Sequence, residues 1–286
     1  MSRVVLLGTG NGKADPERFS PASVLWLGEE PVLVDCGNGA LLRLRAAGVP
    51  PGSIRKVFLT HLHFDHYSDL PYLVIEPLIG EAAFDRGNLT VYGPPGTERL
   101  VRYFEQAYDV ELDGYAALEG YERARDLARS HVVEISEGWS AEINGWRVSA
   151  RMVDHGVVRL PCFAFRFDGP EGRAVAFSGD TVPCRAMAEL AHRVDLLIHE
   201  CNFPDEEVET RKRLGFAWYI HSTPSGVGPI AQAAEAKKLA LNHFVGWNDF
   251  SAEHEPYEWD AIAPPIVSRD YSGELIIGRD LLQIDF

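Results

Sequence analysis

Short apolar runs, many of them rich in β-branched residues, recur along the whole chain and predict a series of β-strands. These runs cover 4–7, 24–27, 31–34, 57–59, 89–92, 132–135, 146–153, 162–167, 174–177, 196–198, 239–241 and 274–277. Helical patterns separate many of the runs, at 39–48, 97–108 and 229–238. This mixture favours an α/β protein with strands in two layers and helices outside them.

The stretch 109–131 departs from this alternation, because apolar residues at helical spacing predict one amphipathic helix over 116–130. The residues at that spacing are Leu118, Tyr121, Ala124, Leu127 and Ala128. We expect this inserted helix to pack on the core, or to form a lid or a homodimer contact. The aromatic residues expected to line an apolar substrate wall are Tyr103, Tyr108, Tyr115, Trp218 and Tyr219.

The chain is strongly acidic, with 27 Lys and Arg against 42 Asp and Glu among 286 residues and a net charge of −15. An acidic surface repels polyanions, whereas nucleic-acid binding needs a basic footprint. The longest basic run, Arg211-Lys212-Arg213, is typical of a solvated helix face. The charge balance therefore argues against a nucleic-acid partner and favours a small-molecule substrate.

The cysteines and the N-terminal segment bear on the compartment. Cys36, Cys162, Cys184 and Cys201 are scattered and suggest neither a disulfide framework nor a structural zinc site. Because no signal-peptide pattern or run of transmembrane length is visible, we expect a cytoplasmic protein without membrane contact. The glycine-rich segment 8–13 lacks the spacing of a P-loop and is interpreted as a structural turn.

The segment after the apolar run 57–59 carries the candidate chemistry, because His61, His63, Asp65 and His66 fall within six residues. Neutral imidazole and carboxylate oxygen are the ligands that divalent cations such as zinc prefer. Four ligand-type side chains exceed what one catalytic zinc usually takes from a single loop. We therefore expect two adjacent metal ions.

This His-x-His-x-Asp-His pattern resembles the hallmark of the metallo-β-lactamase superfamily of metal-dependent hydrolases. Further segments match that family in order: 32–37 with Asp35, 153–156 with His155, 177–181 with Asp180 and 241–244 with His243. The resemblance implies a four-layer αββα sandwich. Since residues from 61 to 243 must converge on one site, we expect 1–286 to form a single domain.

The resemblance also implies a ligand set for two divalent ions. The residues assigned to one ion are His61, His63 and His155, those assigned to the other are Asp65, His66 and His243, and Asp180 bridges the two. The aspartate of the first segment would support the histidine loop from behind the ligands. Zinc is the first candidate metal, and manganese and iron stay open because His and Asp ligands suit all three.

Two more segments, 197–200 and 220–224, resemble the branch of the family that contains the tRNA 3′-end endonuclease ribonuclease Z, arylsulfatase-type enzymes and related phosphodiesterases. In that branch the equivalent of His221 points at the substrate oxygens beside the metals, and Glu200 is a candidate to orient it. The candidate catalytic residues are therefore Asp65, His221 and Glu200. His199 has no assigned role.

The function expected first is hydrolysis of a small ester, a phosphodiester or an aryl sulfate, by a metal-bridging hydroxide. The main alternative is a tRNA 3′-end processing endonuclease. Against that alternative stand the acidity of the chain and the short interval between His155 and Asp180, where typical members carry a long tRNA-binding arm. A lactonase or β-lactamase-type hydrolase and a metal-retaining sensor or binding protein are further alternatives.

Overall fold

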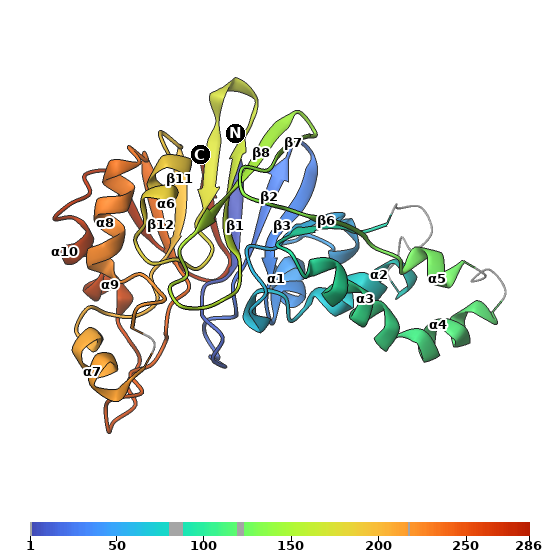
Figure 1. Cartoon of the computed structure of the whole chain (residues 1–286), viewed down its shortest axis with the longest axis horizontal. Helices are drawn as coiled ribbons and strands as arrows, with labels where there is room; N and C mark the ends of the chain where they lie inside the picture. Colours follow the sequence, from blue (N-terminus) through green and yellow to red (C-terminus); the bar gives the residue numbers. More distant parts are fainter. Residues whose placement is uncertain (1, 80–87, 119–122, 217) are drawn as a thin grey trace.

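The computed structural model describes residues 2–79, 88–118, 123–216 and 218–286, and within them two seven-stranded sheets face each other (Figure 1). The first sheet has the order β14 (Leu282–Asp285), β1 (Arg3–Gly8), β2 (Ala22–Leu27), β3 (Glu30–Cys36), β4 (Lys56–Phe58), β5 (Thr90–Gly93), β6 (His131–Glu134). The second has the order β13 (Glu274–Ile277), β12 (Lys238–Asn242), β11 (Leu196–Glu200), β10 (Ala174–Phe177), β9 (Cys162–Asp168), β8 (Trp146–Val153), β7 (Ser140–Ile143).

Helices cover the outer faces of both sheets (Figure 1). On the side of the first sheet lie α1 (Ala40–Ala46), α2 (Leu70–Ile79), α3 (Thr97–Ala107), α4 (Asp109–Ala116) and α5 (Ala124–Leu127). On the side of the second lie α6 (Arg185–Leu190), α7 (Glu207–Leu214), α8 (Pro224–Ala233), α9 (Trp259–Ile262) and α10 (Pro264–Val267). Short 3₁₀ turns are η1 (Pro51–Ser53), η2 (Phe64–His66) and η3 (Pro170–Gly172). The predicted αββα sandwich is confirmed, and the single domain over 1–286 stays a prediction.

The core between the sheets is aromatic. Alternate residues of β9, Phe163, Phe165 and Phe167, point into the sheet interface and are at most 1% exposed. Phe58 of β4 crosses from the other sheet, with its ring centroid 5.6 Å from that of Phe165 and 5.2 Å from that of Phe167. Because such rings bury large apolar areas in edge-to-face contacts, they fix the spacing of the two sheets.

The central strands are buried on both faces, which explains their continuous apolar runs. Behind β11 and β12, Leu197, Leu239 and Leu241 pack with buried side chains of α8 in a second cluster. Behind β4, Val57 and Leu59 pack with side chains of α1 and α2. The functional side chains therefore extend from strands that are packed from both sides.

Parallel pairing brings several strand ends to one edge of the sandwich. Strands β3, β4, β5 and β6 run parallel in the first sheet, and β10, β11, β12 and β13 run parallel in the second. Loops that follow parallel strands meet at the same edge. The histidine loop follows β4, Asp180 follows β10 and His243 follows β12. Residues distant in the sequence can therefore share one site.

The prediction of one helix over 116–130 is wrong. Helix α4 ends at Ala116, α5 covers only Ala124–Leu127, and Tyr121 lies outside the described residues. The two short helices project with α3 beyond the sandwich, at the right of Figure 1.

Helices α4 and α5 pack on α2, whereas α3 also contributes Val101 to the cluster behind the first sheet. Their apolar side chains form a separate cluster that comprises Ile75, Leu78, Leu112, Ala124 and Ala128, with Tyr108 and Tyr115 packed against it. These two tyrosines therefore serve the packing of the projection and do not continue an aromatic wall to Trp218. A lid or a homodimer contact in this region stays a prediction.

Two further expectations concern membranes and thiols. Within the described ranges, none of the helices combines the length and the apolar character needed to cross a bilayer. All four cysteines are free thiols, and Cys36, Cys162 and Cys201 are buried. The predicted absence of a disulfide framework agrees with the structure.

Candidate metal centre

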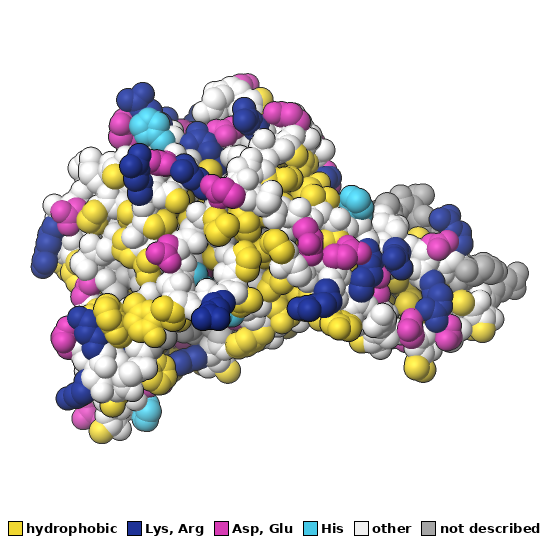
Figure 2. All heavy atoms as spheres, in the orientation of Figure 1, with side chains coloured by type: hydrophobic (Ala, Val, Ile, Leu, Met, Phe, Trp, Pro, Cys, Tyr) yellow, Lys and Arg dark blue, Asp and Glu magenta, His cyan; other side chains and the backbone are white. Residues whose placement is uncertain are grey.

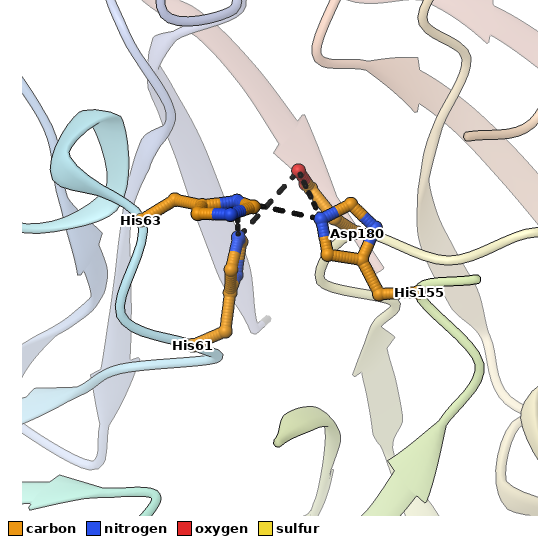
Figure 3. Close-up of side chains that lie close together, drawn as sticks. All are labelled: His61, His63, His155 and Asp180. Carbon is orange, nitrogen blue, oxygen red and sulfur yellow. Dashed lines mark hydrogen bonds and ion pairs between the residues drawn. The ribbon is translucent and has the colours of Figure 1, made fainter. Parts of the chain in front are cut away.

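Ligand-type side chains gather in three overlapping groups at the edge of the sandwich. His61, His63, His155 and Asp180 form one group, in which one ligand atom of each residue lies within 4.8 Å of the others. Their side chains point toward a common space, the three imidazoles from two loops and the carboxylate from a third (Figure 3). Asp65, His66 and His243 form the second group by the same criterion.

The histidine loop is shaped by hydrogen bonds to the aspartate that ends β3. Asp35 Oδ1 accepts from the backbone N–H of Thr60 (2.8 Å), and the Thr60 hydroxyl lies 3.0 Å from Asp35 Oδ2. The backbone N–H of His66 donates to the carbonyl of His63 (3.0 Å), which closes the turn η2. This turn directs His63 toward one group and Asp65 toward the other.

Asp35 also orients a ligand-type imidazole. His66 Nδ1 lies 2.8 Å from Asp35 Oδ2, so this nitrogen carries the proton and Nε2 is free to bind a cation. Asp35 itself adopts φ 58°, a left-handed conformation that costs free energy for a residue with a side chain. The end of β3 therefore holds a strained backbone that places this carboxylate behind the histidines.

His243 and His155 are oriented in comparable ways. His243 also has a left-handed φ of 64°, and its Nδ1 hydrogen-bonds the side-chain amide of Asn202 (2.9 Å). His155 Nδ1 donates to the carbonyl of Ile220 (2.7 Å), which leaves Nε2 as the acceptor. Burial lowers the pKa of His155 to about 4, so this imidazole is neutral, as a metal ligand must be.

Asp180 joins the two groups. Its Oδ2 lies 3.6 Å from His61 Nε2 and its Oδ1 lies 3.3 Å from the Nε2 atoms of both His66 and His243. Asp180 is 2% exposed, and Oδ1 has no hydrogen-bond partner within the described part of the chain. A buried carboxylate oxygen without a partner is costly. The two divergent oxygens among imidazole nitrogens fit a carboxylate that bridges two cations.

Charge within the groups is strongly coupled. Burial acts to raise the pKa of Asp180, but His243 and His66 outweigh it and hold that pKa well below its usual range. Burial acts to lower the pKa of His66. The carboxylates of Asp180, Asp35 and Asp65 outweigh burial and raise this pKa well above its ordinary value. In metal-free protein the imidazole of His66 is thus protonated. It must lose this proton before it can bind a metal ion.

Glu200 and His221 form a pair next to the first two groups, and His221 also forms the third group with Asp180 and His243. His221 Nδ1 lies 3.1 Å from Glu200 Oε2, and Glu200 Oε1 accepts from the backbone N–H of Thr181 (2.6 Å). The side chain of His221 is 15% exposed, whereas that of Glu200 is 2% exposed. His221 Nδ1 lies 3.8 Å from Asp180 Oδ2. The imidazole therefore reaches from a buried carboxylate toward the opening of the site.

Burial and the charge of Asp180 raise the pKa of Glu200 well above its usual value, and burial lowers the pKa of His221. These opposite shifts disfavour the carboxylate–imidazolium ion pair and favour a shared proton between two neutral groups. A proton held in this way is available to a substrate oxygen.

His199 does not belong to the site. It is fully buried, its Nδ1 donates to the carbonyl of Glu200 (2.7 Å), and alternation along β11 directs it away from the Glu200 side chain. Burial lowers its pKa to about 4. The residues that the sequence did not indicate are Thr60 and Asn202, both polar residues directly beside a predicted ligand or catalytic segment.

One sequence interpretation about basic residues needs correction. Arg211 is buried, because its guanidinium lies 4.0 Å above the ring of Phe203 and pairs with Glu207 Oε2 (2.5 Å). Lys212 and Arg213 are exposed as expected. The interpretation of this run as a solvated helix face is therefore wrong for its first residue.

A family model described as "Beta-lactamase superfamily domain" matches residues 31–244. Ribonuclease Z of Mycobacterium bovis (strain BCG / Pasteur 1173P2) is 30% identical over 291 residues, which cover 100% of this chain and 98% of that relative. Ribonuclease Z of Mycolicibacterium gilvum (strain PYR-GCK) is 32% identical over 290 residues, which cover 99% and 96%.

Solved structures share the fold. The metallo-beta-lactamase fold protein YhfI from Bacillus subtilis superposes with a TM-score of 0.72 at 20% identity, covering 99% of this chain and 98% of that one. Human tRNase Z, short form, superposes with a TM-score of 0.70 at 23% identity and the same coverage. At these identities the similarity concerns the fold.

The expectation that nucleic acid is not a partner is wrong, because the relatives that match over their whole length are named for action on RNA. Net charge averages over the entire surface, whereas binding depends on the local distribution of charge. The argument from the short interval between His155 and Asp180 also fails. Alignments that cover 96–98% of these relatives leave them little length for an additional arm.

Proposed function

Because the chain belongs to the beta-lactamase superfamily and is one of its metal-dependent hydrolases, we propose that it acts as a ribonuclease Z-type endonuclease. Its substrate is then a phosphodiester bond near the 3′ end of a precursor tRNA. The observation that carries this proposal is the match, at 30% identity and over the full chain, to relatives named ribonuclease Z. A small ester or an aryl sulfate as the natural substrate has less support, because the relatives described above are named ribonuclease Z.

We assign the metal ligands from the two side-chain groups. His61, His63 and His155 would hold one ion, Asp65, His66 and His243 the other, and the two oxygens of Asp180 would be shared. Two divalent ions, when bound, supply a hydroxide near neutral pH and stabilise charge on the phosphate oxygens. We propose zinc, with manganese and iron as the alternatives that metal analysis distinguishes.

The chain itself would position and move protons. His221 donates a hydrogen bond to a phosphate oxygen and then a proton to the leaving 3′ oxygen, because it is the exposed member of the Glu200–His221 pair. Glu200 holds the imidazole in orientation and shares a proton with its Nδ1. Asp35 keeps His66 in the tautomer that can bind metal. Asp65, which we predicted to be catalytic, is assigned here as a ligand of the second ion.

Cleavage of a precursor tRNA tests the proposal. Zinc- and manganese-loaded protein is incubated with a precursor tRNA labelled on its 3′ trailer, and in parallel with an aryl phosphodiester, an aryl sulfate and a lactone. We expect a cut near the 3′ end of the tRNA, with a rate that falls steeply with salt because phosphate contacts release counterions. Protein carrying Asp180→Ala, purified in the same way, controls for contaminating nuclease. Intact tRNA together with rapid turnover of an aryl ester would refute the proposal.

A further inference from the structure

Exposed apolar side chains gather on three segments that border the metal centre. Of the fourteen large apolar side chains that are exposed among the described residues, seven lie on these segments. They are Phe64 in the histidine loop, Val157 and Leu160 after His155, and Leu214, Phe216, Trp218 and Tyr219 before His221. Exposed apolar side chains scattered singly need no explanation, but a concentration around a catalytic site indicates a binding surface.

The aromatic side chains lie close in the sequence to the proposed ligands and catalytic residues, and their segments contact one another. Tyr219 lies two positions before His221, and a Cβ added to Gly156 would lie 2.4 Å from the carbonyl oxygen of Tyr219. The turn after His155 therefore packs tightly on this segment, which leaves no room for a side chain at Gly156. Phe64 lies between His63 and Asp65, and its ring tip lies 3.0 Å from the Cβ position of Gly12.

The support beneath this segment is rigid. Arg211 stacks on Phe203 and lies 5.5 Å from the ring centroid of Phe250 and 5.9 Å from that of Phe216. Its partner Glu207 also accepts from the hydroxyl of Tyr257. These contacts hold α7 against the loop that follows β12. The segment that carries the exposed aromatic side chains is thus held in place by buried contacts.

Trp218 has the geometry of an open stacking surface. It is 38% exposed and Tyr219 is 40% exposed, with ring centroids 5.4 Å apart at an interplanar angle of 86°. The ammonium of Lys212 lies 4.7 Å from the Trp218 ring centroid. The edge-to-face arrangement leaves ring surface available to a planar ligand.

Basic residues lie on the same segments as the aromatic side chains although the chain as a whole is acidic. Arg159 lies in the loop after His155 and Arg213 at the end of α7, and both are exposed. Neither forms an ion pair with another residue of the described ranges. Lys13, which follows Gly12, pairs with Asp249. Burial, and to a smaller extent the charge of Arg211, lower the pKa of Lys13, so this lysine lies near the same region. Planar aromatic rings next to unpaired cations match the bases and phosphates of a single-stranded nucleic acid.

We infer that Phe64, Trp218 and Tyr219, with Arg159 and Arg213, bind the unpaired nucleotides next to the scissile phosphodiester by base stacking and phosphate contacts. This inference rests on the proposed function and identifies the part of the substrate that the site would recognise. A folded tRNA body offers few free base faces, whereas an unpaired 3′ segment offers one on each nucleotide. An apolar peptide is the other occupant to consider, and it would not require Arg159 or Arg213.

The test measures binding without requiring cleavage. A fluorescent single-stranded DNA oligonucleotide is titrated into metal-loaded wild-type protein and the Trp218→Ala, Trp218→Phe and Tyr103→Ala variants, and Kd is read from anisotropy. An oligonucleotide of equal length with abasic sites is the matched ligand control. Tyr103 is the matched protein control because it is 61% exposed but lies on α3, outside the aromatic surface. Metal content and thermal melting of each variant are compared with those of the wild type.

We expect Trp218→Ala to raise Kd about tenfold or more for the oligonucleotide with bases, as the loss of one stacked base implies. Trp218→Phe should recover most of this loss, Tyr103→Ala should change nothing, and all four proteins should bind the abasic oligonucleotide alike. Phe64→Ala is the second variant and should also raise Kd. Equal affinity of wild type and Trp218→Ala for both ligands would overturn the inference.

The two proposals fail in different ways. If precursor tRNA is not cut but Trp218→Ala weakens binding only of the oligonucleotide with bases, the proposed function is wrong and the stacking surface stands. If tRNA is cut at its 3′ end and Trp218→Ala leaves KM and Kd unchanged, the proposed function stands and the stacking surface is wrong.

Discussion

The metal centre and the projecting helices α3 to α5 both hold many charged groups, but the two regions differ in burial and in pairing. In the projection, Arg125 pairs with Asp109 (2.7 Å) and Asp113 (2.5 Å), and all three side chains are about half exposed or more. In the centre, Asp180 and His61 are almost completely buried, and one oxygen of Asp180 lacks a hydrogen-bond partner within the described residues. Exposed pairs contribute little to stability, whereas a buried partnerless oxygen is costly unless a ligand satisfies it. A buried carboxylate oxygen without a hydrogen bond thus indicates function more reliably than charge density does.

Removal of the shared carboxylate should have the largest effect. Asp180→Ala should lower metal content below two ions per chain and reduce kcat about 10³-fold or more, because several kcal/mol of charge stabilisation depend on the ions. Elemental analysis and single-turnover cleavage measure the two effects. Full occupancy together with full activity would contradict the bridging assignment.

His221 tests whether the pair beside the centre is catalytic or a ligand. His221→Ala should retain both ions and lower kcat about 10²- to 10⁴-fold, as expected for loss of a proton donor or an oxyanion contact. Glu200→Gln should have a smaller effect in the same direction. Loss of one metal equivalent in His221→Ala would make His221 a ligand, an outcome that its position 3.8 Å from Asp180 allows.

Asp35 tests the support behind the ligands. Asp35→Asn removes the charge that orients His66, so metal affinity should fall about 10- to 100-fold. Competition with a coloured chelator measures the change. Asp126→Asn in the projection is the control, because its side chain is 74% exposed. Equal losses of affinity in the two variants would mean that Asp35 acts only through general charge.

Acidity should oppose metal binding through His66. Because the neighbouring carboxylates raise its pKa well above the ordinary value, His66 is protonated below that raised pKa and must lose its proton when metal binds. Metal affinity should therefore fall as pH falls, by about tenfold per pH unit where one proton is exchanged. Calorimetry in buffers of different ionisation enthalpy measures the released proton. A pH-independent affinity would show that His66 is not a ligand.

The smallest effect is expected in the projection. Arg125→Ala breaks two exposed ion pairs, so the melting temperature should change by no more than about 2 °C, and turnover of a small aryl phosphodiester should stay the same. A large loss of activity with an unchanged melting temperature would contradict the view that the projection has no functional role. It would mean that the projection contacts substrate or a second copy of the chain.

The sequence predicts which ligand-type side chains gather at this edge, because the segments that carry them follow apolar runs that became buried strands. His61 follows β4 and His243 follows β12, so local patterns gave both the strands and the residues at their ends. Asp35 itself adopts a left-handed backbone conformation (φ 58°), which no local sequence pattern predicts. Its role followed from the resemblance alone.

The projection and the basic residues could not be predicted in the same way. Helical spacing over 116–130 is preserved when two short helices pack on α2, so periodicity does not reveal where one helix ends. Arg211 is buried because Phe203 and Phe250 surround it, and no local pattern links these residues. The expectation about nucleic acid failed for a related reason, since a total of charges contains no information on their positions.

The origin of the ligands in both sheets has a mechanical consequence. The histidine loop follows a strand of the first sheet, whereas His155, Asp180 and His243 follow strands of the second, so each group of ligands spans the two layers. An ion held by such a group would act as a further cross-link between two halves of the sandwich, which side-chain packing and backbone hydrogen bonds, such as that from the N–H of Phe163 to the carbonyl of Thr60 (2.9 Å), already join. Removal of the metal by a chelator would then lower the stability of the fold as well as abolish activity. The free energy of unfolding would depend on the metal concentration.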